Sequence, residues 1–141
     1  MVALVLSLAP NTTANETEPI TEDSFQEVVD LNSSMMKGKA IYEGKGTCYI
    51  CHQMTGLGLP PAFPPLANAD YLLEDKDRAI RQTMYGAKEP ITVNGATYPG
   101  GVMTVTPLTD EEVMHVVNYI LNSWGNDGGT VTIEEVQAQR Q

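Results

Sequence analysis

The sequence predicts an all-α domain with a small β-hairpin flap. Two observations favour this fold class: apolar residues recur near helical spacing in three segments, and strand-like alternation is confined to one short stretch. The 141 residues are enough for one domain with its own core and too few for two globular domains. We divide the chain into a flexible leader or linker over residues 1–33 and one folded domain over residues 34–141.

The leader is polar and acidic. No Lys or Arg lies between Pro10 and Ser33, a composition typical of a linker. The apolar run Val2–Ala9 is too short to span a bilayer as a helix, and no basic residue precedes it. It fits the trimmed end of an export signal, a lipid-anchored leader or the tail of an upstream segment. Any membrane attachment is expected to come from this leader or anchor alone.

Two helices are expected in the first two thirds of the chain. Met35–Lys45 has apolar residues near helical spacing, and Ser33 or Ser34 can cap its start. Asp75–Tyr85 begins with acidic residues, which suit the start of a helix. Each segment is followed directly by a glycine, the residue that most often ends a helix.

A β-hairpin is expected after the second helix. Ile91-Thr92-Val93 and Ala96-Thr97-Tyr98 alternate in the manner of strands. Between them lies the pair Asn94-Gly95, which tolerates the positive φ angles of a type I′ turn. We expect a small flap.

The longest amphipathic helix is predicted at Asp110–Trp124. Thr109 and Glu112 form a capping-box pattern at its start, and one face carries a continuous apolar stripe. Thr132 and Glu135 repeat the capping pattern before a short final helix. The apolar stripe needs a surface to pack against.

The clearest chemical signal is Cys48-Tyr49-Ile50-Cys51-His52. Two thiols three residues apart, followed at once by a histidine, are the signal for covalent attachment of one haem c, with His52 as an iron ligand. A zinc half-site is disfavoured because the chain holds only one other Cys or His, His115. A thioredoxin-like redox pair is disfavoured because no βαβ pattern surrounds it.

The second axial ligand should come from well downstream of the motif. Of the seven methionines, Met103 lies in an irregular loop just before the long helix, where a thioether can be directed at iron. His115 is the alternative and would give two histidine ligands, but it lies off the apolar stripe and is expected to be a surface residue. Methionine ligation closes both axial positions and favours electron transfer over oxygen chemistry.

A loop with four prolines follows the motif, from Pro60 to Pro65. Prolines lack the N–H that regular structure needs, so this loop must be held by other contacts. An axial histidine needs an acceptor for its second ring nitrogen. A backbone carbonyl near Pro60 or Pro65 is a candidate; a merely stiff surface loop is the alternative.

The charge balance restricts the partners. The formal net charge is −10, so nucleic acid is an unsuitable partner. A docking protein with a basic patch is favoured, because complementary fields act on the rate of encounter.

Several stretches together carry a resemblance to a known family: the Cys48–His52 motif, Gly38 and Tyr42 before it, Tyr119 after it, and the segments 56–67, 90–95, 102–103, 108–112 and 122–126. They resemble class I cytochrome c domains, and more narrowly those tethered to or serving copper-containing nitrite reductases. The resemblance implies first and last helices packed around one covalent haem, with Met103 as the distal ligand and Pro65 and Leu66 among the haem contacts. The sequence departs where the family commonly has proline, at Thr104.

The expected function is that of an electron carrier and not an enzyme. The resemblance implies a bacterial periplasmic protein that binds no substrate and donates single electrons to a redox protein. Copper nitrite reductase, a terminal oxidase and a periplasmic dehydrogenase are the partner classes, the first implying a place in denitrification. The alternative is a haem enzyme or gas-binding sensor in which Met103 is a labile ligand.

Overall fold

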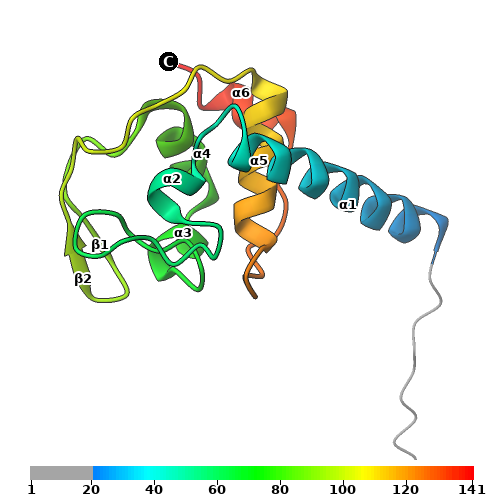
Figure 1. Ribbon diagram of the computed structural model, residues 1–141. Helices are drawn as coiled ribbons and strands as arrows, with labels where there is room; N and C mark the ends of the chain where they lie inside the picture. The colour runs from blue at the N-terminus through cyan, green and yellow to red at the C-terminus, as the bar shows by residue number, and fades with distance from the viewer. Residues whose placement is uncertain (1–20) are drawn as a thin grey trace, which may run out of the picture.

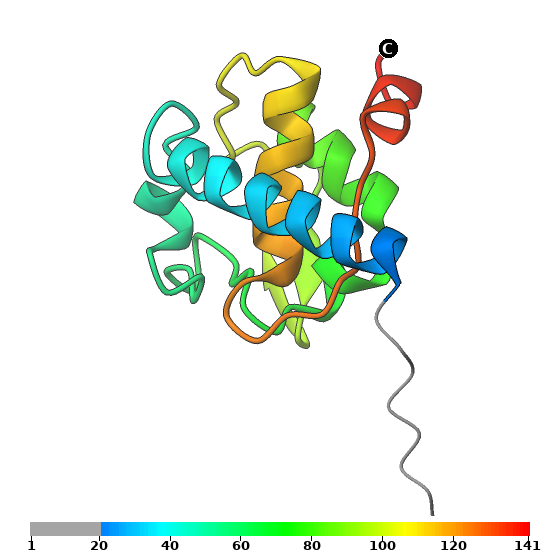
Figure 2. The ribbon, with the colours of Figure 1, turned by 90° about the vertical axis from the view of Figure 1, so that its right-hand side faces the viewer.

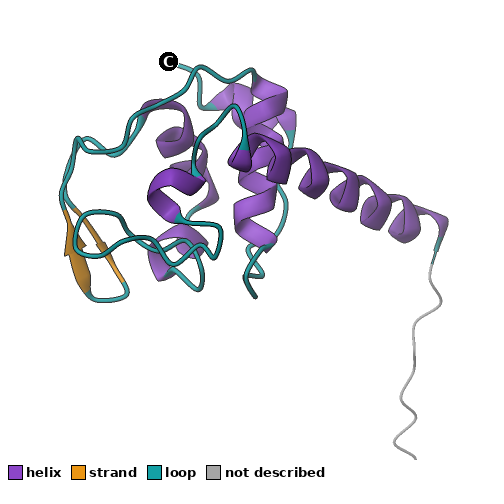
Figure 3. Cartoon of the chain, viewed as in Figure 1, coloured by secondary structure: helices purple, strands orange, loops and turns teal. Residues whose placement is uncertain are grey.

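The computed structural model describes residues 21–141, which form a mostly helical domain with one two-stranded antiparallel sheet (Figures 1 and 3). This confirms the predicted fold class. No helix in the described range is both long enough and apolar enough to cross a membrane. The elements are α1 Glu22–Glu43, α2 Tyr49–His52, α3 Asp70–Glu74, α4 Lys76–Tyr85, β1 Ile91–Val93, β2 Ala96–Tyr98, α5 Asp110–Asn122 and α6 Ile133–Ala138.

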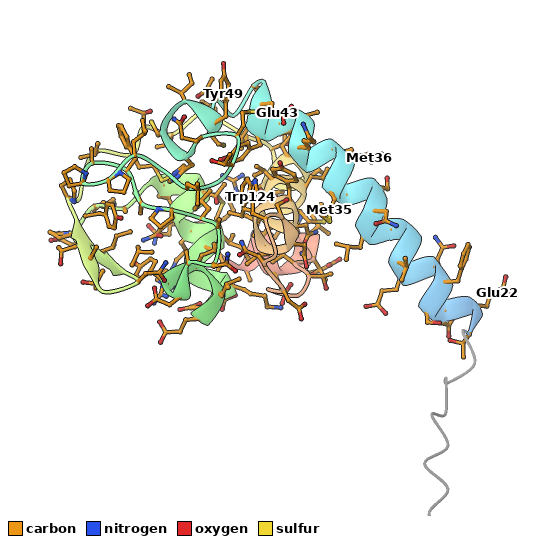
Figure 4. The ribbon with its side chains drawn as sticks, turned by 60° about the horizontal axis from the view of Figure 1, so that its bottom comes forward. Glu22, Met35, Met36, Glu43, Tyr49 and Trp124 are labelled. Carbon is orange, nitrogen blue, oxygen red and sulfur yellow. The ribbon has the colours of Figure 1, made fainter. Side chains whose placement is uncertain are left out.

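Helix α1 begins at Glu22, well before the expected Met35. Thr21 caps it by accepting a hydrogen bond from the Ser24 amide, and acidic residues in the first turn suit the positive end of the helix. From Glu22 onward, the polar stretch that predicted a linker therefore forms an exposed helical extension, which projects from the domain at its Glu22 end (Figure 4). The division at residue 34 stays a prediction, and Val2–Ala9 lies outside the described residues.

Helices α1 and α5 cross closely, and Gly38 permits this (Figure 2). A Cβ atom at Gly38 would lie 2.1 Å from the His115 carbonyl oxygen and 2.6 Å from Cβ of Tyr119. Beside this contact the rings of Tyr42 and Tyr119 pack with centroids 5.3 Å apart. The predicted stripe of α5 provides buried core residues: Val113, Val116, Val117, Ile120 and Leu121.

Ser34 does not cap a helix as expected. It lies inside α1, and its buried hydroxyl joins a polar network between α1 and α5. The Asn118 side chain donates to Ser34 Oγ over 3.1 Å and also pairs with both backbone groups of Val131. Ser34 Oγ also lies 2.8 Å from Nδ1 of His115. A buried polar residue in the first helix is thus satisfied by partners far along the chain.

Most of the remaining predictions of local structure are confirmed, but α1 ends at Glu43, before the predicted Lys45. Asp75 caps α4, and Thr109 and Thr132 form capping boxes at α5 and α6. The hairpin pairs Ile91 with Tyr98, and Asn94 and Gly95 have φ angles of 49° and 80°. Helix α5 ends at Asn122, earlier than the predicted Trp124.

The hairpin is anchored to the domain and is more than a flap. Val93 and Tyr98 are buried in the core. The Asn94 amide donates to the Asp70 carboxylate, and the Asn94 side chain accepts from the Asp70 amide. Asp70 begins α3, a helix too short to leave a periodic pattern in the sequence.

Candidate functional site

A largely apolar cavity lies between α2, the proline segment, α4, the hairpin and the loop before α5. Its walls include core residues such as Tyr42, Val116 and Ile120. The structure brings all six sequence-predicted site residues to this one cavity: Cys48, Cys51, His52, Pro65, Leu66 and Met103.

The two thiols belong to the cavity wall and are not joined to each other. Cys48 lies at the start of α2 and Cys51 within it; both are half-buried. Burial raises the pKa of the Cys48 thiol to about 11. A redox-active Cys-x-x-Cys pair instead has a thiol of lowered pKa at an exposed position. The environment therefore argues against a thioredoxin-like site.

His52 is fixed by the proline segment. Its Nδ1–H donates to the carbonyl oxygen of Pro64 over 3.0 Å, next to the expected Pro65 rather than at Pro60. Burial lowers the pKa of His52, which favours the neutral ring. With the proton held on Nδ1, the Nε2 lone pair is the one available to a metal.

Gly58 makes this hydrogen bond possible. It has a φ angle of +66°, and a Cβ there would lie 2.4 Å from the Pro64 carbonyl oxygen. The Gly58 amide donates to the His52 carbonyl over 3.0 Å, and Leu59 pairs with Phe63 in a single bridge. The loop therefore folds back so that the Pro64 carbonyl meets His52.

Trp124 holds the start of the same loop. Its indole N–H donates to the Met54 carbonyl over 2.9 Å, and a Cβ at Gly56 would lie 2.6 Å from its ring. The Gly56 carbonyl accepts from the Leu66 amide over 2.7 Å. These supports were missed by the residue-based reasoning, because nothing in local periodicity links Trp124 to a glycine that far back in the chain.

Asn126 holds the far end of the loop. Its buried side chain donates to the carbonyls of Leu66 and Ile120 and accepts from the Asn68 amide. One side chain thereby pairs with backbone groups from two separate parts of the chain. The sequence offered Asn126 only as part of a family resemblance.

Met103 and His115 lie in different places. Met103 is in the loop between β2 and α5 and lines the cavity, with its carbonyl against Gly86 at the end of α4. His115 is not among the lining residues; it is half-buried at the α1–α5 contact, where Ser34 is its partner. His115 is therefore only partly at the surface, because α1 covers it on the side of Ser34.

The cavity has a chemical character that fits a haem. Its walls are mostly apolar, which suits a porphyrin ring. Arg78 reaches this wall, stacks over the Tyr71 ring and donates through Nη2 to Glu74. Its Nε–H is buried without a partner. A buried unpaired donor calls for an acceptor, and a haem propionate would supply one. In the described range no three His, Cys, Asp or Glu residues gather to hold a metal ion by themselves.

A comparison with protein families decides the assignment. The family described as cytochrome c matches residues 35–124, more than half of the chain. The chain belongs to the cytochrome c family. Haem c is therefore its cofactor, attached through Cys48 and Cys51, as the motif predicted.

The chain is similar to several named cytochromes. It is 36% identical to cytochrome c-552 of Thermus thermophilus over 65% of this chain and 68% of that protein. It is 30% identical to the cytochrome c subunit of the quinone alcohol dehydrogenase of Gluconobacter oxydans, over 66% of this chain and 20% of the subunit. It is 29% identical to the fructose dehydrogenase cytochrome subunit of Gluconobacter japonicus, over 77% of this chain and 24% of that subunit. The chain thus spans about a quarter or less of these dehydrogenase subunits.

Proposed function

We propose that this cytochrome c is a single-electron carrier whose haem iron is held by His52 and Met103. The observation that carries the proposal is that both side chains line the same apolar cavity as the two cysteines, with Nδ1 of His52 held by Pro64. Haem iron supplies a one-electron redox couple when bound. Arg78, the cysteines and the apolar wall would hold and orient the group.

The ligand set favours electron transfer over catalysis. With the imidazole of His52 and the thioether of Met103 as its ligands, the iron would have no free position for a substrate. The apolar wall and a neutral thioether would both stabilise the reduced, less charged iron, so we expect a raised reduction potential.

A second function, gas binding or haem catalysis, has one observation in its favour. Met103 is 38% exposed and lies in a run of exposed residues, Gly101 to Val105, with Thr104 where the family commonly has proline. A loop with few buried contacts opens at low cost, which would free the iron.

The partner is a redox protein, and the site of action lies outside the cytoplasm. The dehydrogenase cytochrome subunits among the similar proteins support a dehydrogenase as the electron source. Copper nitrite reductase and a terminal oxidase rest on the sequence resemblance alone, as does a bacterial periplasmic location with a tether through the leader.

Carbon monoxide binding tests the ligand set. We expect the reduced, haem-loaded protein to bind no carbon monoxide, because Met103 occupies the site. Met103→Ala should bind it, whereas Met84→Ala, on α4 and not among the residues that line the cavity, should behave as the parent. Ready binding by the parent protein would support the sensor or enzyme and overturn the electron carrier.

A further inference from the structure

One side of helix α1 packs on the domain, and the opposite side faces away from it. Ser34, Gly38 and Tyr42 follow one another at four-residue intervals, so they share one side of the helix, and all three are buried where α1 meets α5. Figure 2 shows α1 across the near side of the domain, with no other described element in front of it. The outer side of α1 is therefore accessible to a partner.

The outer side of α1 carries exposed residues at the spacing of a helix-pairing contact. Phe25 and Met36 are 61% and 71% exposed, and Asn32, also exposed, lies between them. The steps of seven and four residues along this row fit the heptad spacing at which one helix packs along another. Glu22 and Lys39, three residues outside Phe25 and Met36, continue the row at its two ends. We call these five residues the α1 seam.

Charge is distributed unevenly along the same helix. Residues 22–30 contain four acidic residues and no basic one: Glu22, Asp23, Glu27 and Asp30. None of the four forms an ion pair with a basic residue that the structure describes. Lys37 and Lys39 lie further along the helix, and Lys39 pairs with Glu43, one turn on. Helix α1 is thus acidic at its start and has its lysines towards its end.

We propose that the α1 seam pairs with the α1 seam of a second copy of the chain, with the two helices antiparallel. In one register, Phe25 of each copy packs on Met36 of the other, and Glu22 of each copy meets Lys39 of the other. Both contacts fit the same register because both pairs are centred on the same point of the helix. A parallel pair would instead place the acidic start of one helix beside that of the other, where like charges repel. The contact is two-fold symmetric, so it closes as a dimer.

The pairing would leave the haem site of each copy free. No residue of the α1 seam lines the cavity, and the domain packs on the other side of α1. The row from Glu22 to Lys39 spans only about 26 Å at 1.5 Å per residue. Asn32 within it would weaken the pairing while helping to fix the register. We therefore expect a weak dimer, with a dissociation constant on the order of 0.1 mM.

Sedimentation equilibrium of the haem-loaded full chain tests the dimer. From about 10 μM to 1 mM, the mean mass of the parent should rise from one copy towards two. Phe25→Asp should raise the dissociation constant by roughly a hundredfold, because each dimer loses two apolar contacts and gains two unpaired charges. Leu57→Asp is the matched control, since Leu57 in the proline loop is 60% exposed and the same charge is added. Its dissociation constant should stay within about twofold of the parent.

Charge reversals test the antiparallel register. Glu22→Lys and Lys39→Glu should each raise the dissociation constant by about tenfold, because each dimer then holds two like-charge contacts. The double variant should return to within about threefold of the parent, and it keeps the net charge at −10. In a parallel pair each position faces itself, so no reversal would change these contacts. Association governed by net charge would respond to the two single reversals with opposite signs.

Three results would overturn the proposal. The first is a parent that stays monomeric at about 1 mM, whether or not it floats with phosphatidylcholine vesicles. The second is a dimer that survives Phe25→Asp or is lost equally in Leu57→Asp. The third is a double charge reversal that fails to restore the dimer. The inference goes beyond the proposed function, and the two fail separately: carbon monoxide binding by the parent would contradict the electron carrier without changing these masses.

Discussion

Gly58 and Pro64 link a backbone conformation to the orientation of His52. The Pro64 carbonyl can accept from His52 only because nothing extends from Gly58 at the point where the loop folds back. The proline loop is therefore the element that orients His52, and Gly58 is a position in this loop where an added Cβ would meet backbone atoms.

Gly58→Ala should destabilise the protein by about 3 kcal/mol, from a positive φ angle and a clash with backbone. Gly95→Ala is the matched control: its φ is +80°, but a Cβ there meets nothing within 4 Å, so we expect a cost of about 1–2 kcal/mol. Denaturant unfolding of the haem-loaded proteins measures both. If both variants lost the same unfolding free energy, the clash of the Gly58→Ala methyl group with the backbone would be contradicted.

At the scale of elements, the contact between α1 and α5 positions the attachment motif. Helix α1 ends shortly before Cys48, and α5 supplies cavity-lining residues such as Val116 and Ile120. The Tyr42 hydroxyl, near the end of α1, also donates to the Gln53 carbonyl just after the motif. The motif is therefore held through the helix crossing as well as through the proline loop.

Gly38→Ala tests the contact between α1 and α5, because this contact decides whether the substitution stabilises or destabilises the protein. In an exposed helix interior, glycine to alanine stabilises by about 1 kcal/mol. Here the added Cβ would lie 2.1 Å from the His115 carbonyl oxygen, so we expect the free energy of unfolding to fall by about 2–3 kcal/mol instead. Asn32→Ala, at an exposed position of the same helix, should be neutral or slightly stabilising. Thermal unfolding that shows Gly38→Ala to be stabilising would refute this packing.

Local signals in the sequence predicted most helices, strands and turns. The features that they did not predict depend on contacts between residues far apart in the chain. The capping boxes at Thr109 and Thr132 and the Asn94-Gly95 turn were predictable because each depends on residues within one turn. The start of α1 was missed because its first half is rich in acidic residues and packs against little, so that even Phe25 and Val28 are exposed. Ser34 was misassigned as a cap because its partners, His115 and Asn118, lie in another helix.

The candidate site also combines residues that local sequence signals predict with residues that only tertiary contacts reveal. Cys48, Cys51 and His52 form a contiguous motif, so their shared location follows from spacing alone. The roles of Trp124 and Asn126 in holding the proline loop depend on tertiary contacts and had no local signal.

At the scale of the whole molecule, the cavity that would hold the haem is continuous with the core. The cavity walls include Tyr42, Val116 and Ile120, which also belong to the main hydrophobic cluster. Aromatic residues make up only 6% of the chain, so few large side chains are available to fill that space. Folding and haem attachment should therefore be coupled.

The double variant Cys48→Ala, Cys51→Ala tests this coupling. Without covalent haem we expect a lower melting temperature and a weak near-ultraviolet circular dichroism signal, because the aromatic residues around the cavity lose fixed packing. Met54→Ala, an exposed change beside the motif, should keep both properties. A double variant that unfolds as cooperatively as the parent, with native aromatic signals, would show that the cavity is stable by itself.

The most direct test of the central claim is NMR of the reduced, haem-loaded protein with ¹³C-labelled methionine methyl groups. All seven methionines are then visible, and a thioether bound to iron lies over the porphyrin, where the ring current shifts its methyl signal far upfield. We predict one such signal, lost in Met103→Leu and retained in Met84→Leu. No upfield methyl signal, or one that survives Met103→Leu, would contradict the assignment of Met103 as the ligand that makes this cytochrome an electron carrier.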